Sequence, residues 1–228
     1  MAYRHEQKYI ITEAEAALLA TRLRLTLPLD PHAVKTGGSY HIRSLYFDDL
    51  YDSAVGEKVA GENIRDKVRI RIYNLGEKGT KLERKHKNGP YIKKESLPLK
   101  RAEAEALVAG DFGFLFRRPE AFAKEMYAAF RLRALRPKVL VDYMREPFLF
   151  CLEDVRVTLD RDIRTGYRCT GLYDKHTPTM PAQEFAQCCI LEVKYNRFLP
   201  SYVRSLLQVN AAQRAAASKY VYCRQFEF

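Results

Sequence analysis

One segment of alternating cations and apolar residues, Arg-Asp-Lys-Val-Arg-Ile-Arg-Ile-Tyr at 65–73, has the residue types and spacing of an anion-binding strand. Successive side chains of a β-strand point to opposite faces, so Arg65, Lys67, Arg69 and Arg71 would form one row and the apolar residues would lie on the other face. Like charges in one row repel each other unless an anion neutralises them. The segment therefore predicts a strand whose polar face binds an anion.

The same pattern recurs along the chain. Arg4, Glu6 and Lys8 have i, i+2, i+4 spacing, and Glu192 and Lys194 repeat it near the C-terminus. A solvated sheet face is the usual alternative for alternating strands, but such a face accepts Ser, Thr, Asn and Gln equally well. The repeated use of Arg, Lys and Glu favours a sheet that closes with this face inward. The remaining members of the set are Glu83, Lys85, Lys94, Tyr143, Arg145 and Arg156.

A cationic interior with a few carboxylates predicts a linear polyanion as ligand. Desolvated like charges cost several kcal/mol each unless they are paired. Arg and Lys would neutralise phosphoryl oxygens, and Arg can do so with two parallel hydrogen bonds. The glutamates would hold a divalent hard cation that bridges the same phosphates.

The overall charge agrees with an anionic partner without identifying it. Among 228 residues, 39 Lys and Arg oppose 28 Asp and Glu, which gives a formal charge of +11 at pH 7. Nucleic acid, an anionic membrane or a polyphosphorylated ligand would all suit this charge. Nucleic acid is disfavoured because aromatic residues are not interleaved with the cations, as base stacking would require.

Composition also limits the compartment and the cofactor chemistry. No apolar run approaches the roughly 18 residues of a spanning helix, and acidic residues interrupt the N-terminal segment where a signal peptide would be apolar. We therefore expect a cytoplasmic protein without a membrane span of its own. The five cysteines form no CxxC pair and the five histidines no HExxH motif, so a disulfide framework and a histidine-based metal site are both disfavoured.

The alternation predicts eight strands. They are expected over residues 5–11, 41–49, 67–73, 80–87, 91–99, 137–148, 154–163 and 188–196. Asn88-Gly89 lies between two of these segments and predicts a tight antiparallel hairpin. Residues 165–187, which contain Gly and Pro, are expected to form a long loop.

Helical patterns fall between the strands, over residues 13–25, 50–60, 101–109, 119–133 and 200–217. Thr12 followed by Glu15 has the spacing of a capping box. Tyr46 and Phe47 are expected to pack at a strand end, and Asp48 to begin the next helix. The fold class is therefore predicted to be α+β, with helices inserted between the strands of an antiparallel sheet that closes into a barrel.

The ordered motifs resemble the VTC domain of polyphosphate polymerases, in the CYTH or triphosphate tunnel metalloenzyme superfamily. They run in the family's order from about Tyr3 to Tyr220: RHEQKY, IRSLYFDD, KVRIRIY, LERK, PKVLVDYMREPF, VRVTLD, ILEVKY followed by LP, and SKY. The resemblance implies one triphosphate tunnel domain over residues 1–228, with eight antiparallel strands. It also implies transfer of the terminal phosphoryl group of a nucleoside triphosphate, ATP by expectation, to inorganic polyphosphate.

The resemblance assigns roles position by position. Glu192, with Glu6, would bind Mn²⁺ or Mg²⁺, although Glu6 could instead pair with a neighbouring cation. Lys94 could exchange with the adjacent Lys93 through a one-residue slip, and Glu83 could bind metal or pair with cations. The catalytic cations would be Lys8, Arg69, Arg71, Lys85 and Lys219, and the other phosphate-binding residues Lys94, Tyr143, Arg145, Arg156, Lys194 and Ser218.

One departure bears on the reaction. The hydrolases of the superfamily have ExExK on the first strand, whereas Arg4 replaces the first carboxylate here. A weaker second metal site would disfavour activation of water and favour transfer to another phosphate. A tri(poly)phosphatase and a non-catalytic polyphosphate or nucleotide sensor remain the alternatives, and a separate membrane protein is a possible partner for the product.

Overall fold

The computed structural model describes residues 5–89, 91–182, 186–207, 213–214 and 217–225. The chain divides into two compact units. Unit 1 comprises Met1–His41, Tyr143–Ile163 and Pro181–Ser218, and unit 2 comprises Ile42–Asp142, Arg164–Met180 and Lys219–Phe228. The single domain over residues 1–228 stays a prediction, and Arg4 lies outside the described residues.

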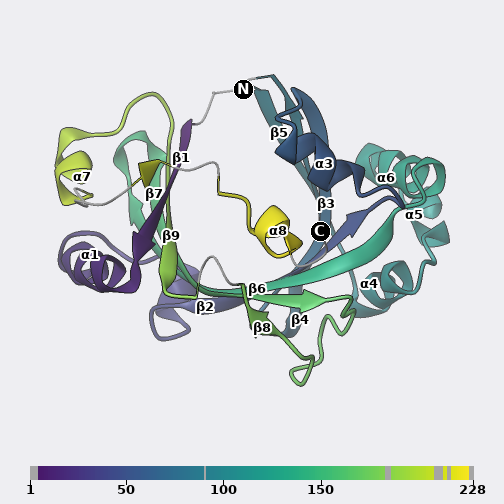
Figure 1. Ribbon diagram of the computed structural model, residues 1–228, viewed down its shortest axis with the longest axis horizontal. Coiled ribbons are helices and arrows are strands. Elements are labelled where there is room, and N and C mark those ends of the chain that lie inside the picture. Colours follow the sequence, from purple (N-terminus) through teal and green to yellow (C-terminus); the bar gives the residue numbers. More distant parts are fainter. Residues whose placement is uncertain (1–4, 90, 183–185, 208–212, 215–216, 226–228) are drawn as a thin grey trace. The chain divides into compact units, whose positions relative to one another are not determined.

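All eight predicted strands are present (Figure 1). They are β1 (His5–Thr12), β2 (Tyr40–Asp48), β3 (Ile64–Tyr73), β4 (Gly76–Asn88), β5 (Tyr91–Pro98), β6 (Arg136–Phe150), β7 (Val155–Tyr167) and β9 (Cys188–Tyr195). The described residues add the two-residue strands β8 (Met180–Pro181) and β10 (Gln213–Arg214). The sheet order is β10-β1-β9-β7-β6-β2-β3-β4-β5, with β8 beside β7.

The strand pairs that carry the candidate residues are antiparallel. They are β1 with β9, β7 with β9, β2 with β3, β3 with β4, and β4 with β5. Helices lie between these strands in the chain, so the predicted α+β class is confirmed. Among the described residues no helix is long and apolar enough to cross a membrane.

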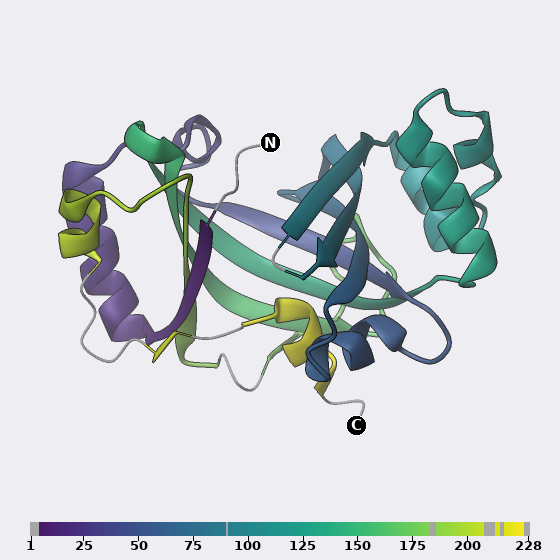
Figure 2. The same cartoon turned by 90° about the horizontal axis from the view of Figure 1, so that it is seen from above.

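In unit 1 helix α1 (Glu13–Thr26) packs on the apolar face of the strands, and Val203 of α7 (Ser201–Leu206) belongs to the same core. Helix α1 begins with the predicted capping box, in which Thr12 and Glu15 exchange hydrogen bonds. Its buried residues pack against Leu191 and Val193 of β9. Because side chains alternate along a strand, this packing leaves Glu192 and Lys194 on the opposite face. Helix α7 lies beside α1 (Figures 1 and 2), and α2 (Pro31–Val34) precedes β2.

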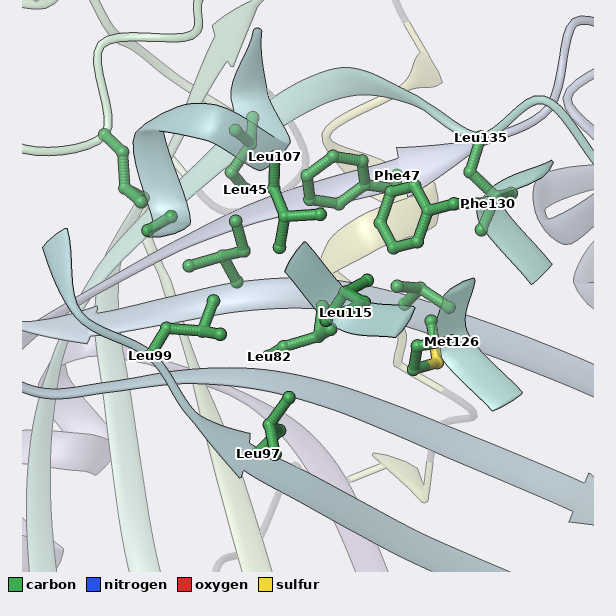
Figure 3. Packing of buried hydrophobic residues seen from close by; sticks show 14 of the residues in the cluster. Leu45, Phe47, Leu82, Leu97, Leu99, Leu107, Leu115, Met126, Phe130 and Leu135 are labelled. Carbon is green, nitrogen blue, oxygen red and sulfur yellow. The ribbon is translucent and has the colours of Figure 1, made fainter. Parts of the chain in front are cut away.

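In unit 2 three helices contribute to one apolar core. Helices α4 (Arg101–Val108), α5 (Gly113–Arg117) and α6 (Ala121–Leu132) pack against the apolar faces of β2 to β5 (Figure 3). Val68, Ile70 and Ile72 of β3 are buried in this core. Arg69 and Arg71 therefore lie on the other face, as the alternation predicts.

Helix α3 differs from the sequence prediction at its start. It spans Ser53–Val59, whereas the pattern predicts residues 50–60. The Asp49 carboxylate accepts hydrogen bonds from the backbone of Tyr51 and Ser53, and Asp52 has a left-handed backbone with φ 56°. This turn delays the helix, so the prediction that Asp48 begins it is wrong.

The C-terminal segment also differs from its predicted helix over residues 200–217. Helix α7 ends at Leu206, and Gln213–Arg214 pair as β10 with Ile10 and Tyr9 of β1. The unpaired edge of β1 offers backbone hydrogen bonds that an alanine-rich pattern does not reveal. Residues 208–212 and 215–216 of the predicted helix lie outside the described residues. A short helix, α8 (Lys219–Tyr222), follows.

The predicted loop over residues 165–187 begins inside a strand, its residues 168–179 have no helix or strand, and its residues 183–185 lie outside the described residues. Strand β7 continues to Tyr167, and β8 pairs with it. The left-handed backbone of Asp162, with φ 46°, does not end the strand.

Candidate functional site

In unit 1 the strand register brings the predicted residues of β1 and β9 onto one face. Lys8 lies opposite Glu192, and Glu6 lies opposite Lys194. On the other side of β9, Arg156 of β7 lies opposite Lys194. Directly opposed residues of an antiparallel pair point to the same side of the sheet. The five residues thus share a face, as their spacing predicts.

Glu192 is the centre of this cluster. Its side chain is only 7% exposed. Its carboxylate oxygens lie 2.9 Å from Lys194 Nζ, 3.4 Å from an Arg145 guanidinium nitrogen and 4.0 Å from Lys8 Nζ. Three cations from three strands therefore converge on one buried carboxylate.

Lys8 links this carboxylate to a second one. Its Nζ lies 3.1 Å from Glu6 and donates a hydrogen bond of 3.3 Å to the carbonyl of Ala217. Burial by itself would lower the pKa of Lys8, but the charges of Glu192 and Glu6 outweigh it and raise that pKa above 10.5. Lys8 is therefore a firmly charged ammonium group, and its hydrogen-bond partner Ala217 directly precedes Ser218 in the chain.

Asp160 is a member of the cluster that the sequence prediction missed. It is fully buried and accepts two hydrogen bonds of 2.7 Å from the Arg145 guanidinium. Burial opposes the charge of Arg145, but the nearby carboxylates, Asp160 first, hold its pKa well above its usual range. The spacing Arg156, Thr158, Asp160 on β7 was the available signal, because it places Asp160 on the face of Arg156.

Arg156 and Tyr143 occupy less central positions. Arg156 donates a 2.7 Å hydrogen bond to Asp30 and lies 3.4 Å from the hydroxyl of Tyr40. Tyr143 is buried, and the Arg145 guanidinium lies 5.4 Å from the centre of its ring. Tyr143 therefore supports Arg145 through its ring as well as carrying the predicted hydroxyl donor.

In unit 2 a second buried glutamate has a matching environment. Glu83 of β4 lies opposite Arg69 of β3, and its side chain is 4% exposed. Its oxygens lie 2.7 Å from Arg69, 2.7 Å from Lys94 and 3.7 Å from Arg71. Burial alone would raise the pKa of Glu83, but the charges of Arg69 and Arg71 outweigh it and lower that pKa. Glu83 thus pairs with cations, which was one of the two roles predicted for it.

The contacts of Lys94 remove the ambiguity with its neighbour. Lys94 contacts Glu83 on the candidate face, whereas Lys93 contacts Glu95 at 2.7 Å. Glu95 also pairs with Arg84, opposite which it lies. Lys94, not Lys93, therefore lies on the face that carries Arg69.

Side chains of β2 orient the two arginines. The Tyr46 hydroxyl accepts a 2.8 Å hydrogen bond from Arg69, and Ser44 Oγ accepts a 3.3 Å bond from Arg71. Tyr46 stacks on Tyr220 of α8 with ring centres 4.6 Å apart. Tyr46 therefore contributes to the site, beyond the packing role predicted for it.

Helix α8 is fixed to the same unit by buried polar contacts. The Tyr220 hydroxyl donates a 2.6 Å hydrogen bond to Asp48, and Arg224 contacts Asp52 at 2.9 Å. Burial raises the pKa of Tyr220, and the charge of Asp48 adds to this effect. Lys219 precedes Tyr220 and is thereby held at the start of the anchored helix. Within the motif Ser218-Lys219-Tyr220, it is Tyr220 that fixes the helix beginning at Lys219.

The carboxylates of unit 1 provide oxygen ligands for a divalent cation. Among the described residues, no three His, Cys, Asp or Glu side chains are gathered as a metal cage. Mg²⁺ is often bound by one or two carboxylates, with phosphate and water supplying the other ligands. Lys8 contacts both Glu192 and Glu6, so these two carboxylates lie near one ammonium group. They provide two oxygen donors of this kind. The donor set therefore fits a cation that is bound together with a phosphate ligand.

Comparisons with known proteins agree with the fold. A family model described as the VTC domain matches residues 3–228. A solved structure from Hippeastrum, described as an adenylyl cyclase candidate with a dominant triphosphatase activity, shares 13% identity with a TM-score of 0.56 and covers 98% of this chain and 95% of that chain. An adenylate cyclase candidate from Bacillus halodurans shares 14% identity with a TM-score of 0.50 and covers 89% of this chain and 84% of that chain.

At these identities the structural likeness shows the fold alone. The α+β tunnel fold predicted from the sequence is confirmed by it. A comparison with curated proteins finds no match.

Proposed function

The chain belongs to the VTC domain family, and we propose on this basis that it is a polyphosphate polymerase. It transfers the terminal phosphoryl group of a nucleoside triphosphate, with ATP as the expected donor, to a growing inorganic polyphosphate chain. The observation that carries the proposal is the pair of clusters in which one buried glutamate holds three cations, Glu192 in unit 1 and Glu83 in unit 2.

Each cluster suits a phosphate chain because its cations are ordered before a ligand arrives. Arg145 is fixed by two hydrogen bonds to Asp160, and Arg69 by Glu83 and Tyr46. Ordered cations lose little conformational entropy when they bind phosphoryl oxygens. Arg also presents several donors at once, so it can contact phosphate while it keeps a carboxylate contact.

The reaction requires positioning and charge neutralisation more than a reactive side chain. A terminal oxygen of the acceptor polyphosphate attacks the γ-phosphorus of the donor. One P–O bond forms there, the bond between the γ-phosphorus and the β,γ-bridging oxygen breaks, and the nucleoside diphosphate leaves. Lys8, Arg145 and Lys194 in unit 1, and Arg69, Arg71 and Lys94 in unit 2, neutralise the phosphates.

A divalent cation, Mn²⁺ or Mg²⁺, would supply Lewis-acid neutralisation of phosphate oxygens when bound. Glu192 would be its main protein ligand and Glu6 the second. Lys8 and Lys194, which contact Glu192 in the absence of ligand, would then pair with phosphate oxygens instead.

A tri(poly)phosphatase is the second candidate. The Hippeastrum protein, whose fold this chain shares, is described by its triphosphatase activity. The difference between the two reactions is the acceptor: water in the hydrolase and a terminal phosphate in the polymerase. Arg4 in place of a carboxylate favours the polymerase, because it leaves fewer ligands for a metal that could activate water.

The test is incubation of the purified protein with ATP and Mn²⁺ or Mg²⁺, followed by gel detection of polyphosphate and separate assays for ADP and orthophosphate. We expect polymer and ADP. Orthophosphate without polymer would replace the proposal by the hydrolase, and tight polyphosphate binding without turnover would replace it by a sensor. Cytoplasmic location and a separate membrane protein as product acceptor stay predictions.

A substitution at Glu192 tests its assignment as the main metal ligand. Glu192→Gln keeps the size of the side chain and removes its charge, so metal-dependent turnover should fall by about a hundredfold or more. Glu77→Gln is the control, because Glu77 is 59% exposed in a surface pair with Arg101. Full turnover of Glu192→Gln would refute the assignment of Glu192.

A further inference from the structure

A row of three lysines crosses unit 2 beside the Arg69–Glu83 pair. Lys67 of β3 lies opposite Lys85 of β4, and Lys85 lies opposite Lys94 of β5. Directly opposed residues share a face and lie close together, and like charges in this position destabilise a sheet. Three lysines side by side are therefore an arrangement that an anion would stabilise.

The surrounding positions make this face strongly cationic. Between Lys67 and Arg71 on β3, and at the positions opposite them on β4 and β5, Glu83 is the one carboxylate on this face among the described residues, because Glu95 lies opposite Arg84 on the other face. The oxygens of Glu83 are already shared by Arg69, Arg71 and Lys94. Within this range the cations on this face are Lys67, Arg69, Arg71, Lys81, Lys85 and Lys94.

Lys67 is directed by an anchored aromatic ring. Its Nζ lies 5.6 Å from the centre of the Tyr220 ring. That ring is fixed by the hydrogen bond of Tyr220 to Asp48 and by stacking on Tyr46. A cation–π contact leaves ammonium protons available for other acceptors. The fixed ring thus holds the ammonium group of Lys67 near Tyr46 and Arg69, on the face that also carries Lys85.

We propose that Lys67, together with Lys85 and Lys94, binds phosphates of a linear polyphosphate that extends beyond the length of a triphosphate. The family resemblance assigns Lys85 and Lys94 to phosphate binding in general, whereas Lys67 has no assigned role. The inference rests on the proposed function for its ligand class. It adds Lys67 as a residue that favours long polyphosphate chains over a triphosphate.

The length of the row supports selection of long chains. Lys67 and Arg71 are four residues apart on one strand, so their Cα atoms lie about 13 Å from each other. A long polyphosphate can contact Arg71, Arg69 and Lys67 at once. When a triphosphate binds at Arg69 and Arg71, fewer of its phosphates lie near Lys67.

The experiment measures binding by isothermal titration without divalent metal, with tripolyphosphate and with a long-chain polyphosphate of defined length as probes. Lys67→Ala should weaken binding of the long chain about fivefold to tenfold, the value of one charged hydrogen bond at a partly exposed site. It should change binding of tripolyphosphate less than about twofold. The salt dependence of long-chain binding should also decrease, because one phosphate contact fewer displaces fewer counterions.

Lys93→Ala is the matched control. It removes the same charge from the same hairpin, but Lys93 contacts Glu95 on the other face. It should leave both affinities unchanged. Lys67→Arg should retain long-chain binding, and Lys67→Gln serves as the neutral variant if the alanine variant unfolds.

The results separate this inference from the proposed function. Equal losses for both probes, or no loss for either, would overturn the chain-length role of Lys67. A protein that makes no polymer but shows the selective loss would overturn the polymerase and support the inference. A protein that makes polymer and binds long chains equally well with and without Lys67 would overturn the inference alone.

Discussion

Glu83 should stabilise unit 2 most strongly when no phosphate ligand is bound. It is the shared partner of Arg69, Arg71 and Lys94, and its side chain is 4% exposed. Glu83→Gln keeps the shape of the side chain and one carbonyl acceptor but removes the negative charge. The three cations would then repel each other in a half-buried setting. A phosphate ligand would restore the lost negative charge.

The expected cost follows from the burial of the partners. Removing one member of a buried ion pair costs about 3–5 kcal/mol. Arg69 is 21% exposed and Lys94 is 52% exposed, so solvent screening favours the lower end, about 3 kcal/mol. For a chain of this size each kcal/mol shifts the melting temperature by about 2–4 °C, which gives a decrease of about 6–12 °C.

The assay is thermal unfolding followed by circular dichroism, with and without saturating tripolyphosphate. We expect Glu83→Gln to melt at a lower temperature without ligand and to gain more from the ligand than the wild type does. Glu77→Gln on the same strand removes an exposed charge and should cost less than about 1 kcal/mol. A Glu83→Gln variant that melts with the wild type in the absence of ligand would refute this reasoning.

The pH dependence gives an independent check on the same group. The pKa of Glu83 is lowered in the folded protein, so its stabilisation is fully present above its ordinary pKa of 4.5 and is lost as the pH falls through the lowered value. The difference between wild type and Glu83→Gln should therefore be constant near neutrality. It should shrink only in acid.

Two further predictions concern single contacts. The pKa of Lys8 is raised above its ordinary 10.5, so its stabilisation is fully present below that pH and is lost as the pH rises through the raised value. The difference in urea stability between wild type and Lys8→Met should therefore be constant near neutrality and decrease only in alkali. A difference that stays constant in alkali as well would contradict the raised pKa. Tyr220→Phe keeps the stacking on Tyr46 but removes the hydrogen bond to buried Asp48. Urea denaturation should therefore show a free energy of unfolding that is lower by about 1–3 kcal/mol. An unchanged midpoint would contradict the anchoring of α8 by this bond.

Local periodicity predicted the strands because each has one apolar face and one polar face. Val68, Ile70 and Ile72 enter the core while Arg69 and Arg71 face away, and this alternation is visible in a single segment. The hairpin at Asn88-Gly89 was equally local, since Gly89 has the positive φ, 57°, that such a turn requires. The alternation of side chains along each strand is therefore enough to identify most of the residues on the candidate face.

The contacts that depend on distant parts of the chain could not be read in this way. The hydrogen bond between Tyr220 and Asp48 joins residues 172 positions apart, and neither residue belongs to a periodic pattern that implies the other. Asp160 was on the right face of its strand but resembled an ordinary polar position. Its burial, and hence its two bonds to Arg145, follows only from packing around β7.

The two buried glutamates suggest why the cations are stable before a ligand binds. Glu192 and Glu83 each serve three cations, so neither carboxylate neutralises all of the charge around it. The excess positive charge attracts a polyanion, while the shared carboxylate keeps the cations ordered and avoids the full cost of mutual repulsion. Replacing a whole cluster, glutamate and cations together, by well-packed apolar residues would gain stability at the expense of binding, which is the compromise expected of a site built for phosphate chains.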